Sequence, residues 1–198
     1  MTSPRWWRRE PRAGDALVAS PELDDPNFRR TVVFVVEHDA GGTLGVVLNR
    51  PGRTPVRAVL AGWQDLMSDP SVLHDGGPVR PDGALCLARL HPIAVAAGAI
   101  AGIRPLVGGI EAIGLVDLDG DADAVARQVS AARVFAGHAG WGAGQLDAEI
   151  AAGAWYVLRA APDDVFGGDS RSLWRRVLRR QPAPLNWVST FPRNPEDN

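Results

Sequence analysis

The run TVVFVVEH at residues 31–38 constrains the fold of this chain more strongly than any other stretch of its 198 residues. Valine and phenylalanine dominate the run, and β-branched and aromatic side chains are enriched in strands. A short, continuous apolar run of this kind indicates a buried strand. The turn sequence DAGG comes next, and TLGVVLNRP at 43–51 predicts a second strand. We therefore expect a β-hairpin, with a loop longer than the tight two-residue kind.

Strand and helix patterns follow one another along the rest of the chain. The further strands that we predict lie at residues 15–20, 71–79, 83–90, 108–119, 132–137 and 154–160. The helices that we predict lie at residues 55–67, 122–131, 144–151, 162–166 and 170–181. The first helix depends on the four-residue spacing of Val59 and Trp63. In the last helix, Ser170 is expected to be the N-cap, and Leu173 and Val177 belong to one apolar stripe.

The order of these elements indicates the fold class. Strands outnumber helices in the first half of the chain, and the two alternate later, while residues 91–103 fit either a weak helix or a glycine-broken strand. This order favours an α+β fold, a mixed α/β arrangement in which helices flank a curved, partly antiparallel, barrel-like sheet, over a doubly wound parallel sheet. We expect one domain at residues 14–181, preceded by a flexible arm (1–13) and followed by an irregular, Pro-rich tail (182–198).

Composition narrows the classes of function. The formal net charge is −2, so the chain as a whole is not a polyelectrolyte binder. All 21 basic residues are arginines, which indicates a coding bias and weakens any argument from the choice of arginine at one position. The single cysteine, Cys86, excludes an internal disulfide and suits a reducing compartment. The N-terminus shows no apolar signal segment, and the longest apolar run, 93–103, is too short to span a bilayer. We expect a cytoplasmic protein without a membrane partner.

Four stretches carry a resemblance to a known family. They are DPNFRRTVVFVVEHDAGGTLGVVLNRP (25–51), GGPV (76–79), GHAGWGAGQLDAEI (137–150) and WYVL (155–158). With these stretches the chain resembles the YqgE/AlgH family, also called UPF0301. The resemblance implies a compact α/β domain with a barrel-like sheet and flanking helices. It implies little about function, because some members are described as transcriptional regulators and no catalytic residues can be carried over.

This chain departs from the family pattern in small ways. Thr31 replaces a usual Ser, and His138 stands where an aromatic residue such as Tyr is common. The Arg- and Trp-rich N-terminal arm is not a family feature.

The glycine-rich stretch at 137–150 raises the question of a phosphate-binding loop. Its place between a strand and a helix suits an anion, because free N–H groups at a helix start favour negative charge. Its glycine spacing, however, matches neither the Walker pattern nor the dinucleotide pattern. Asp147 and Glu149 in the first helical turns also oppose a bound phosphate. We therefore favour an architectural role for these glycines.

The two interpretations of this stretch make different predictions. The architectural one predicts that Trp141, Leu146 and Ile150 are buried. The other makes Gly140, Trp141 and Gln145 ligand-binding candidates. It leaves open whether Gln145 and the N–H groups of the loop face a groove or the protein's own backbone.

Two shorter motifs supply further ligand-binding candidates. In LNRP, Asn49 and Arg50 stand at a strand end and offer donors to an anionic or amide-bearing ligand. In GGPV, Gly76 and Gly77 allow a ligand to approach the backbone closely. Turn chemistry is the alternative in both motifs, with Asn49 bonded to local backbone and Arg50 solvated.

An enzyme of unrecognised type is the alternative to a binding protein. It would use Glu37, His38 and Glu149 with Asn49. Alternation along a strand places Glu37 and His38 on opposite faces, so a general base would need a partner from elsewhere. The four histidines show no metal-ligand spacing, so we predict no metal site, and no motif points to a cofactor. A non-catalytic function is favoured, because no set of nucleophile and base can be assembled.

The last predicted helix carries four arginines opposite its apolar stripe, namely Arg175, Arg176, Arg179 and Arg180. They are candidates for contact with nucleic acid, although a solvated face is the usual meaning of such a helix and no helix-turn-helix pair precedes it. The sequence thus favours a non-catalytic binding or regulatory protein. Its partner would be a small ligand or a protein, with nucleic acid less well supported.

Overall fold

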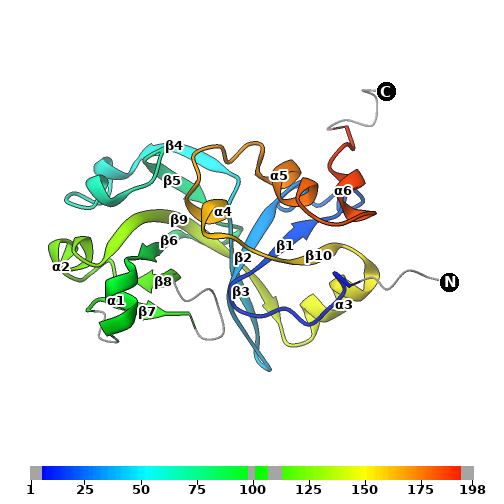
Figure 1. Cartoon of the computed structure of the whole chain (residues 1–198), viewed down its shortest axis with the longest axis horizontal. Coiled ribbons are helices and arrows are strands. Elements are labelled where there is room, and N and C mark those ends of the chain that lie inside the picture. Colours follow the sequence, from blue (N-terminus) through cyan, green and yellow to red (C-terminus); the bar gives the residue numbers. More distant parts are fainter. Residues whose placement is uncertain (1–5, 98–100, 107–112, 193–198) are drawn as a thin grey trace.

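The predicted hairpin supplies two neighbouring strands of a large curved sheet (Figure 1). The computed structural model describes residues 6–97, 101–106 and 113–192. In it, β2 (Val32–Asp39) pairs antiparallel with β3 (Gly42–Val47), as the sequence predicts. The apolar half of β2 is buried. The hairpin therefore lies inside the sheet, with strands on both sides.

The described residues contribute ten strands to this sheet. The remaining ones are β1 (Asp15–Ala19), β4 (Pro51–Pro55), β5 (Val72–Asp75), β6 (Val79–Leu90), β7 (Ile103–Pro105), β8 (Ile113–Val116), β9 (Val129–Gly142) and β10 (Trp155–Arg159). The main path is β10-β1-β2-β3-β9-β6-β8-β7, and neighbours along it are antiparallel. Off this path, β4 pairs with β5, which runs parallel to β9.

An ion pair demonstrates how strongly the sheet curls. In the strand order, β3, β9, β6 and β8 separate β2 from the edge strand β7. A flat sheet would place two such strands roughly five spacings of about 4.8 Å apart. Nevertheless, a guanidinium nitrogen of Arg104 in β7 lies 2.6 Å from Oε1 of Glu37 in β2. The sheet is therefore a half-barrel, and its curvature follows from the length of β9, which pairs with both β3 and β6.

Six α-helices of the described chain flank the sheet (Figure 1). They are α1 (Pro92–Ala97), α2 (Ala122–Ala126), α3 (Gln145–Ala152), α4 (Pro162–Phe166), α5 (Leu173–Arg179) and α6 (Leu185–Val188). Helices α1 and α2 lie beside the half formed by β6, β8 and β7, whereas α5 and α6 lie near β1. Among these helices, none is long and apolar enough to cross a membrane. The predicted α+β class with a curved, partly antiparallel, barrel-like sheet is confirmed.

Three groups of buried apolar side chains make up the core. The largest lies between the sheet and α4 and α5, and includes Phe34, Phe135 and Trp174. A second packs α3 against β9 and β10. The third lies under β6, β8 and α2, and contains the inward-facing Cys86.

The prediction of a helix at residues 55–67 is wrong. Its place is taken by two short 3₁₀ turns, Val56–Ala58 and Gln64–Leu66. Val59 is 52% exposed whereas Trp63 is 5% exposed, so the two do not share a buried face. Gly62, with a φ of 89°, interrupts the segment in a conformation that a right-handed helix cannot contain.

Two boundaries differ because long-range pairing overrides the local pattern. The helix predicted at 122–131 ends at Ala126, and Val129 instead begins β9 by pairing with Leu90. The strand predicted at 132–137 consequently extends over the whole of Val129–Gly142. The first glycines of the glycine-rich stretch therefore belong to a strand rather than to a loop.

The C-terminal part also differs in detail. Helix α5 starts at Leu173, three residues later than predicted, and its N-cap is Ser172, whose side chain bonds Asp169; Ser170 does not cap it. Its apolar stripe is buried as predicted. The tail predicted to be irregular contains α6. In the ambiguous region, 92–97 is helical, while part of the strand predicted at 108–119 lies outside the described residues.

The described part of the N-terminal arm contacts the domain. The carbonyl of Trp7 accepts a hydrogen bond from Val157 N at the open edge of β10 (3.0 Å). Both terminal nitrogens of Arg9 donate to the carboxylate of Asp15, each over 2.7 Å. The Asp15 side chain is fully buried, so this bidentate pair replaces the water that the carboxylate loses on folding. The domain boundary at residue 14 stays a prediction.

Glycine is required where the chain crosses from β5 to β6. Gly76 O accepts from Val47 N (2.9 Å), and Gly76 N donates to Ala136 O (2.8 Å), so Gly76 bridges the end of β3 and the middle of β9. A Cβ at this position would overlap the carbonyl oxygen of Gly137. The close approach of the two backbones leaves no room for a side chain.

We predict that Gly76→Ala lowers the free energy of unfolding by about 2 kcal/mol or more, because backbone atoms must shift to admit the methyl group. Urea unfolding measures the change. Gly142→Ala is the matched control, since a Cβ there would meet nothing within 4 Å. Equal effects of the two substitutions would contradict this role of Gly76.

A buried histidine lies beside a buried arginine at β5 and β9. His74 has no exposed surface, and its Nε2 has no hydrogen-bond partner among the described residues. Arg133 donates to the carbonyls of Asp69 (2.8 Å) and Val165 (2.6 Å), but to no carboxylate of the described chain. Burial, together with the charge of Arg133, lowers the pKa of His74 from 6.5 to about 4. His74 is therefore neutral in the folded protein at neutral pH.

This shift predicts acid sensitivity. The unfolded chain takes up a proton near pH 6.5, whereas folded His74 resists protonation down to a pKa of about 4. The stability that His74 contributes is therefore fully present above pH 6.5 and is lost as the pH falls toward 4, by about 3 kcal/mol in total. Unfolding measured at both ends of this range should show a smaller difference for His74→Phe than for the natural protein. The exposed His91→Gln is the control, and parallel losses in all three proteins would count against the prediction.

Candidate functional site

The glycine-rich stretch ends in a cluster of hydrogen bonds around the carboxylate of Glu149, which we call the Glu149 lock. Its Oε2 accepts hydrogen bonds from the indole N–H of Trp141 (3.0 Å) and of Trp155 (2.8 Å). Its Oε1 accepts from Nε2 of Gln145 (3.1 Å). One side chain of α3 thus joins the end of β9 to the start of β10.

Packing reinforces this lock. Phe28 stacks on Trp141 with ring centroids 5.8 Å apart, and meets Trp155 edge-on. Trp141, Leu146 and Ile150 are buried, which confirms the burial predicted for them. The stretch therefore has a clear architectural role.

The question left open about Gln145 is answered by its partners. Its Oε1 accepts from the backbone N–H of Gly142 (3.1 Å), while its Nε2 is bonded to Glu149. Gln145 therefore faces the protein's own backbone. Gly140 is exposed on β9, and Gly144 is the N-cap of α3, with a φ of 70°.

The two polar residues of the LNRP motif differ in role: Asn49 is bonded to the protein's own backbone, and Arg50 lines a surface groove. The Asn49 side chain accepts from Val32 N (2.9 Å) and donates to Arg30 O (2.8 Å), so it fixes the start of β2. Arg50 donates to Pro26 O (2.7 Å) and lines a groove on the surface. Asn49 thus positions the chain around this groove rather than presenting a free amide to it.

We call this feature the arginine groove; its volume is about 490 Å³. Its walls come from the segment before β2, the segment after β3 and the start of α5. The lining residues are Arg29, Arg30, Asn49, Arg50, Arg171, Trp174 and Arg175. Among the described residues, the wall holds five arginines and no carboxylate, on a protein whose net charge is −2.

The arginines of the groove are held to different degrees. The guanidinium of Arg30 lies 4.1 Å from the centre of the Trp174 ring and donates to the carbonyls of Phe191 and Pro192. Arg29 and Arg171 are exposed, and in the described structure their side chains make no hydrogen bond or ion pair. The groove thus combines fixed cations with cations whose donors are available.

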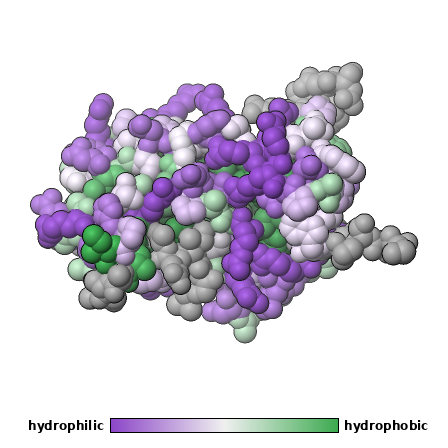
Figure 2. All heavy atoms as spheres, in the orientation of Figure 1, coloured by the Kyte–Doolittle hydropathy of each residue, from purple (hydrophilic) through white to green (hydrophobic). Residues whose placement is uncertain are grey.

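The four arginines predicted as a nucleic-acid face lie on α5 and at its C-cap, and their role stays a prediction. Of the four, Arg175 lines the groove. Arg176 donates to the carbonyls of Asp169 and Asp163, and Arg180 is paired with the buried carboxylate of Asp164. Hydrophilic residues do gather over α5 (Figure 2), but part of this charge is used within the protein.

Comparison with known proteins now identifies the family. The AlgH-like family model matches residues 16–186. The chain belongs to this family. A UPF0301 protein of Mycobacterium avium (strain 104) is 49% identical over 181 residues, covering 91% of this chain and 88% of the relative. A UPF0301 protein of Streptomyces avermitilis is 48% identical over 185 residues, covering 93% and 94%.

Solved structures agree with this AlgH-like assignment. Protein DIP2367 of Corynebacterium diphtheriae has a TM-score of 0.87 and 34% identity, with 96% of this chain and 100% of that chain covered. The AlgH protein of Pseudomonas aeruginosa has a TM-score of 0.61, with 97% of each chain covered, and at 24% identity it supports the fold alone. The whole arginine groove lies within the residues that the AlgH-like model matches.

The residues of the enzyme alternative have separate partners in this AlgH-like fold. Glu37 is paired with Arg104, and Nδ1 of His38 lies 2.7 Å from the Thr43 hydroxyl. Glu149 is occupied by its two indoles. Across the described residues, no group of three potential metal ligands comes together.

Sequence reasoning missed three arginines of the groove, Arg29, Arg30 and Arg171. The pair at 29–30 stands inside the motif that carries the family resemblance, which was a usable signal. Nothing in the sequence, however, indicates that residue 171 lies beside it.

We predict that Glu149→Leu lowers the free energy of unfolding by about 2 kcal/mol or more, since it leaves two indole N–H groups without their acceptor. Glu149→Gln should have a smaller effect, because it keeps one acceptor oxygen. Urea unfolding followed by tryptophan fluorescence measures both. Asp147→Asn, an exposed position of the same helix, should change little; if it matched Glu149→Leu, the lock would have no special importance.

Proposed function

We propose that this protein is a non-catalytic binding protein whose arginine groove holds a small, phosphate-bearing ligand. The observation that supports the proposal is the convergence of five arginines, from three separate segments, on one groove whose described lining residues include no carboxylate. Bringing like charges together is unfavourable unless an anion compensates them. A phosphate group supplies such compensation.

The chemistry of the guanidinium group favours this ligand class. Its planar fork donates two parallel hydrogen bonds to phosphate, and these charge-assisted bonds are stronger than neutral ones. Arg30 and Arg50 are already held by backbone carbonyls, so less side-chain entropy is lost when they bind. The volume of about 490 Å³ falls within the range of roughly 300–1,000 Å³ usual for small-molecule pockets.

The same lining supports binding rather than catalysis. Arginine, asparagine and tryptophan are the residue types in the wall. None of them exchanges a proton readily near neutral pH, which general acid–base catalysis requires. A regulatory role would need the ligand to alter a surface, and Arg30 offers a route because it joins the groove to residues 191–192 near the C-terminus.

A cytoplasmic location belongs to the same proposal. Cys86 is a free, buried thiol, and burial raises its pKa to about 12. A lone unreactive thiol suits a reducing compartment.

Titration calorimetry with inorganic pyrophosphate at low salt tests the groove. We predict binding that weakens about tenfold or more in the double variant Arg29→Gln, Arg171→Gln, because hydrogen bonds to two charged groups are lost. Both side chains are exposed, so folding should be unaffected. Arg179→Gln is the control, since it removes an exposed arginine of α5 outside the groove.

A gel-shift series with duplex DNA at increasing salt separates a nucleic-acid interface from a small-ligand site. If DNA binds with a steep salt dependence while pyrophosphate does not bind, the small-ligand proposal is wrong. Loss of DNA binding in the same double variant would then assign the groove to nucleic acid.

A further inference from the structure

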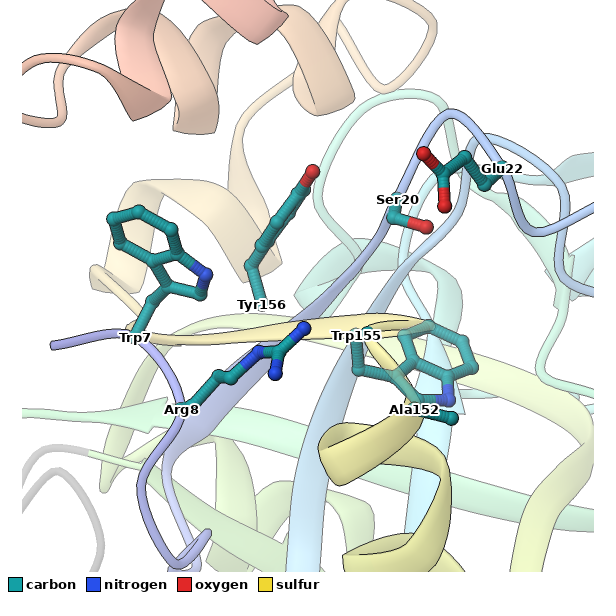
Figure 3. Close-up of a pocket in the computed structure, with 8 residues that line it drawn as sticks. Trp7, Arg8, Ser20, Glu22, Ala152, Trp155 and Tyr156 are labelled. Carbon is teal, nitrogen blue, oxygen red and sulfur yellow. The ribbon is translucent and has the colours of Figure 1, made fainter. Parts of the chain in front are cut away.

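A second pocket lies between the N-terminal arm, the end of β1 and the start of β10 (Figure 3). Its volume is about 290 Å³. The side chains that carry its chemistry are Trp7, Arg8, Ser20, Glu22, Trp155 and Tyr156. It shares no lining residue with the arginine groove.

The arm that forms one wall of this pocket is fixed in place. Trp7 O is bonded to Val157 N, and the Trp7 ring meets Tyr156 edge-on at 6.1 Å. The bidentate pair of Arg9 with buried Asp15 anchors the next turn of the chain. Trp7 and Arg8 therefore face the pocket from a positioned backbone, although both precede the residues that the family model matches.

Two opposite charges face this pocket without neutralising each other. Figure 3 shows the Glu22 carboxylate beside Ser20, and the Arg8 guanidinium between Trp7 and Trp155, below Tyr156. Within the described residues, no ion pair joins Arg8 to Glu22, and neither side chain makes a hydrogen bond. Burial and the charge of Glu22 raise the pKa of Tyr156, while Arg8 opposes the shift. The phenol thus lies within electrostatic reach of both charges.

A buried hydroxyl adds independent evidence for a ligand. Ser20 is 3% exposed and lines the pocket, but its Oγ has no hydrogen-bond partner in the part of the chain that the structure describes. Buried polar atoms are nearly always satisfied, because an unmade hydrogen bond is costly. A polar atom held in the pocket would supply the missing partner.

We propose that this pocket binds a small zwitterion that carries a carboxylate and an organic ammonium group, as α-amino acids and betaines do. The carboxylate would pair with the Arg8 guanidinium, which donates two hydrogen bonds to such a group. The ammonium end would lie toward Glu22, against the rings of Tyr156 and Trp7, since aromatic faces attract organic cations. A ligand with one charge alone leaves either Arg8 or Glu22 uncompensated.

Calorimetry with four probes tests the ligand class. The zwitterions are glycine betaine and L-leucine, and the single-charge probes are choline and acetate. At least one zwitterion should bind about tenfold more tightly than both single-charge probes, since the second charge adds a charge-assisted contact. Preference for betaine would assign the ammonium site to the aromatic faces, and preference for leucine would assign it to hydrogen bonding by Glu22 and Ser20. If all four bind equally, or none binds tighter than about 1 mM, the proposal is wrong.

Three variants locate the binding. Arg8→Gln and Glu22→Gln should each weaken the better zwitterion about tenfold, because each removes one charged contact. Arg12→Gln is the matched control, as an exposed arginine of the same arm outside the pocket. Equal losses in Arg8→Gln and Arg12→Gln would overturn the assignment. The double variant Arg29→Gln, Arg171→Gln should bind the zwitterion normally, so failure of the arginine groove and failure of this pocket are distinguishable.

Discussion

The approach of Gly76 and Gly77 to β9 is the constraint on which the half-barrel depends. Gly76 bridges Val47 and Ala136, and an ideal Cβ at Gly77 would lie 2.5 Å from the carbonyl of His138. Only backbones without side chains can run this close. The contact holds the ends of β3 and β5 against one long strand, so that β9 serves both halves of the sheet. The arginine groove depends on this arrangement, because the segment that follows β3 supplies Asn49 and Arg50.

Carboxylates, of which Asp15 and Asp164 are buried, then attach the outer segments to this frame. Asp15 holds the arm through Arg9, Asp164 holds α5 through Arg180, and Glu149 holds two indoles. Each carboxylate loses water on folding and is compensated by donors of fixed geometry. Such contacts are specific, since a displaced partner leaves a buried charge unpaired. They add directional contacts to the apolar packing that also holds these segments.

The part of this architecture that could be predicted from sequence is the part set by local patterns. The apolar run at 31–38 is a buried strand, and the spacing of Leu146 and Ile150 gives a buried helix face. The segment 55–67 failed because Gly62 and long-range packing outweigh the spacing of two apolar residues. The glycine-rich stretch was partly misplaced for a related reason. Gly137 serves a close contact with Gly77, which lies far away in the sequence.

In the candidate sites, too, local patterns predict single residues, whereas the fold decides which residues meet. Arg50 could be proposed from its place at a strand end, but the groove also requires Arg29 and Arg171, which are 142 positions apart (171 − 29). The pocket beside the arm was not foreseeable, because Trp7 and Arg8 reach it through the pairing of residue 9 with a buried aspartate. No local pattern encodes such a meeting of segments.

The arginines of this protein fall into two groups: some pair with buried carboxylates, and others donate to backbone carbonyls and can still bind an anion. With lysine absent, the choice of arginine carries no information, so the partners of each arginine must be compared instead. Arg9 and Arg180 pair with buried carboxylates, as expected of cations that stabilise a fold. Arg50 and Arg175 are held by backbone carbonyls, which orient a guanidinium while leaving its charge uncompensated. Because these guanidinium groups are held in place but not neutralised, the groove keeps a positive electrostatic potential on an acidic protein. Such a potential concentrates anions there.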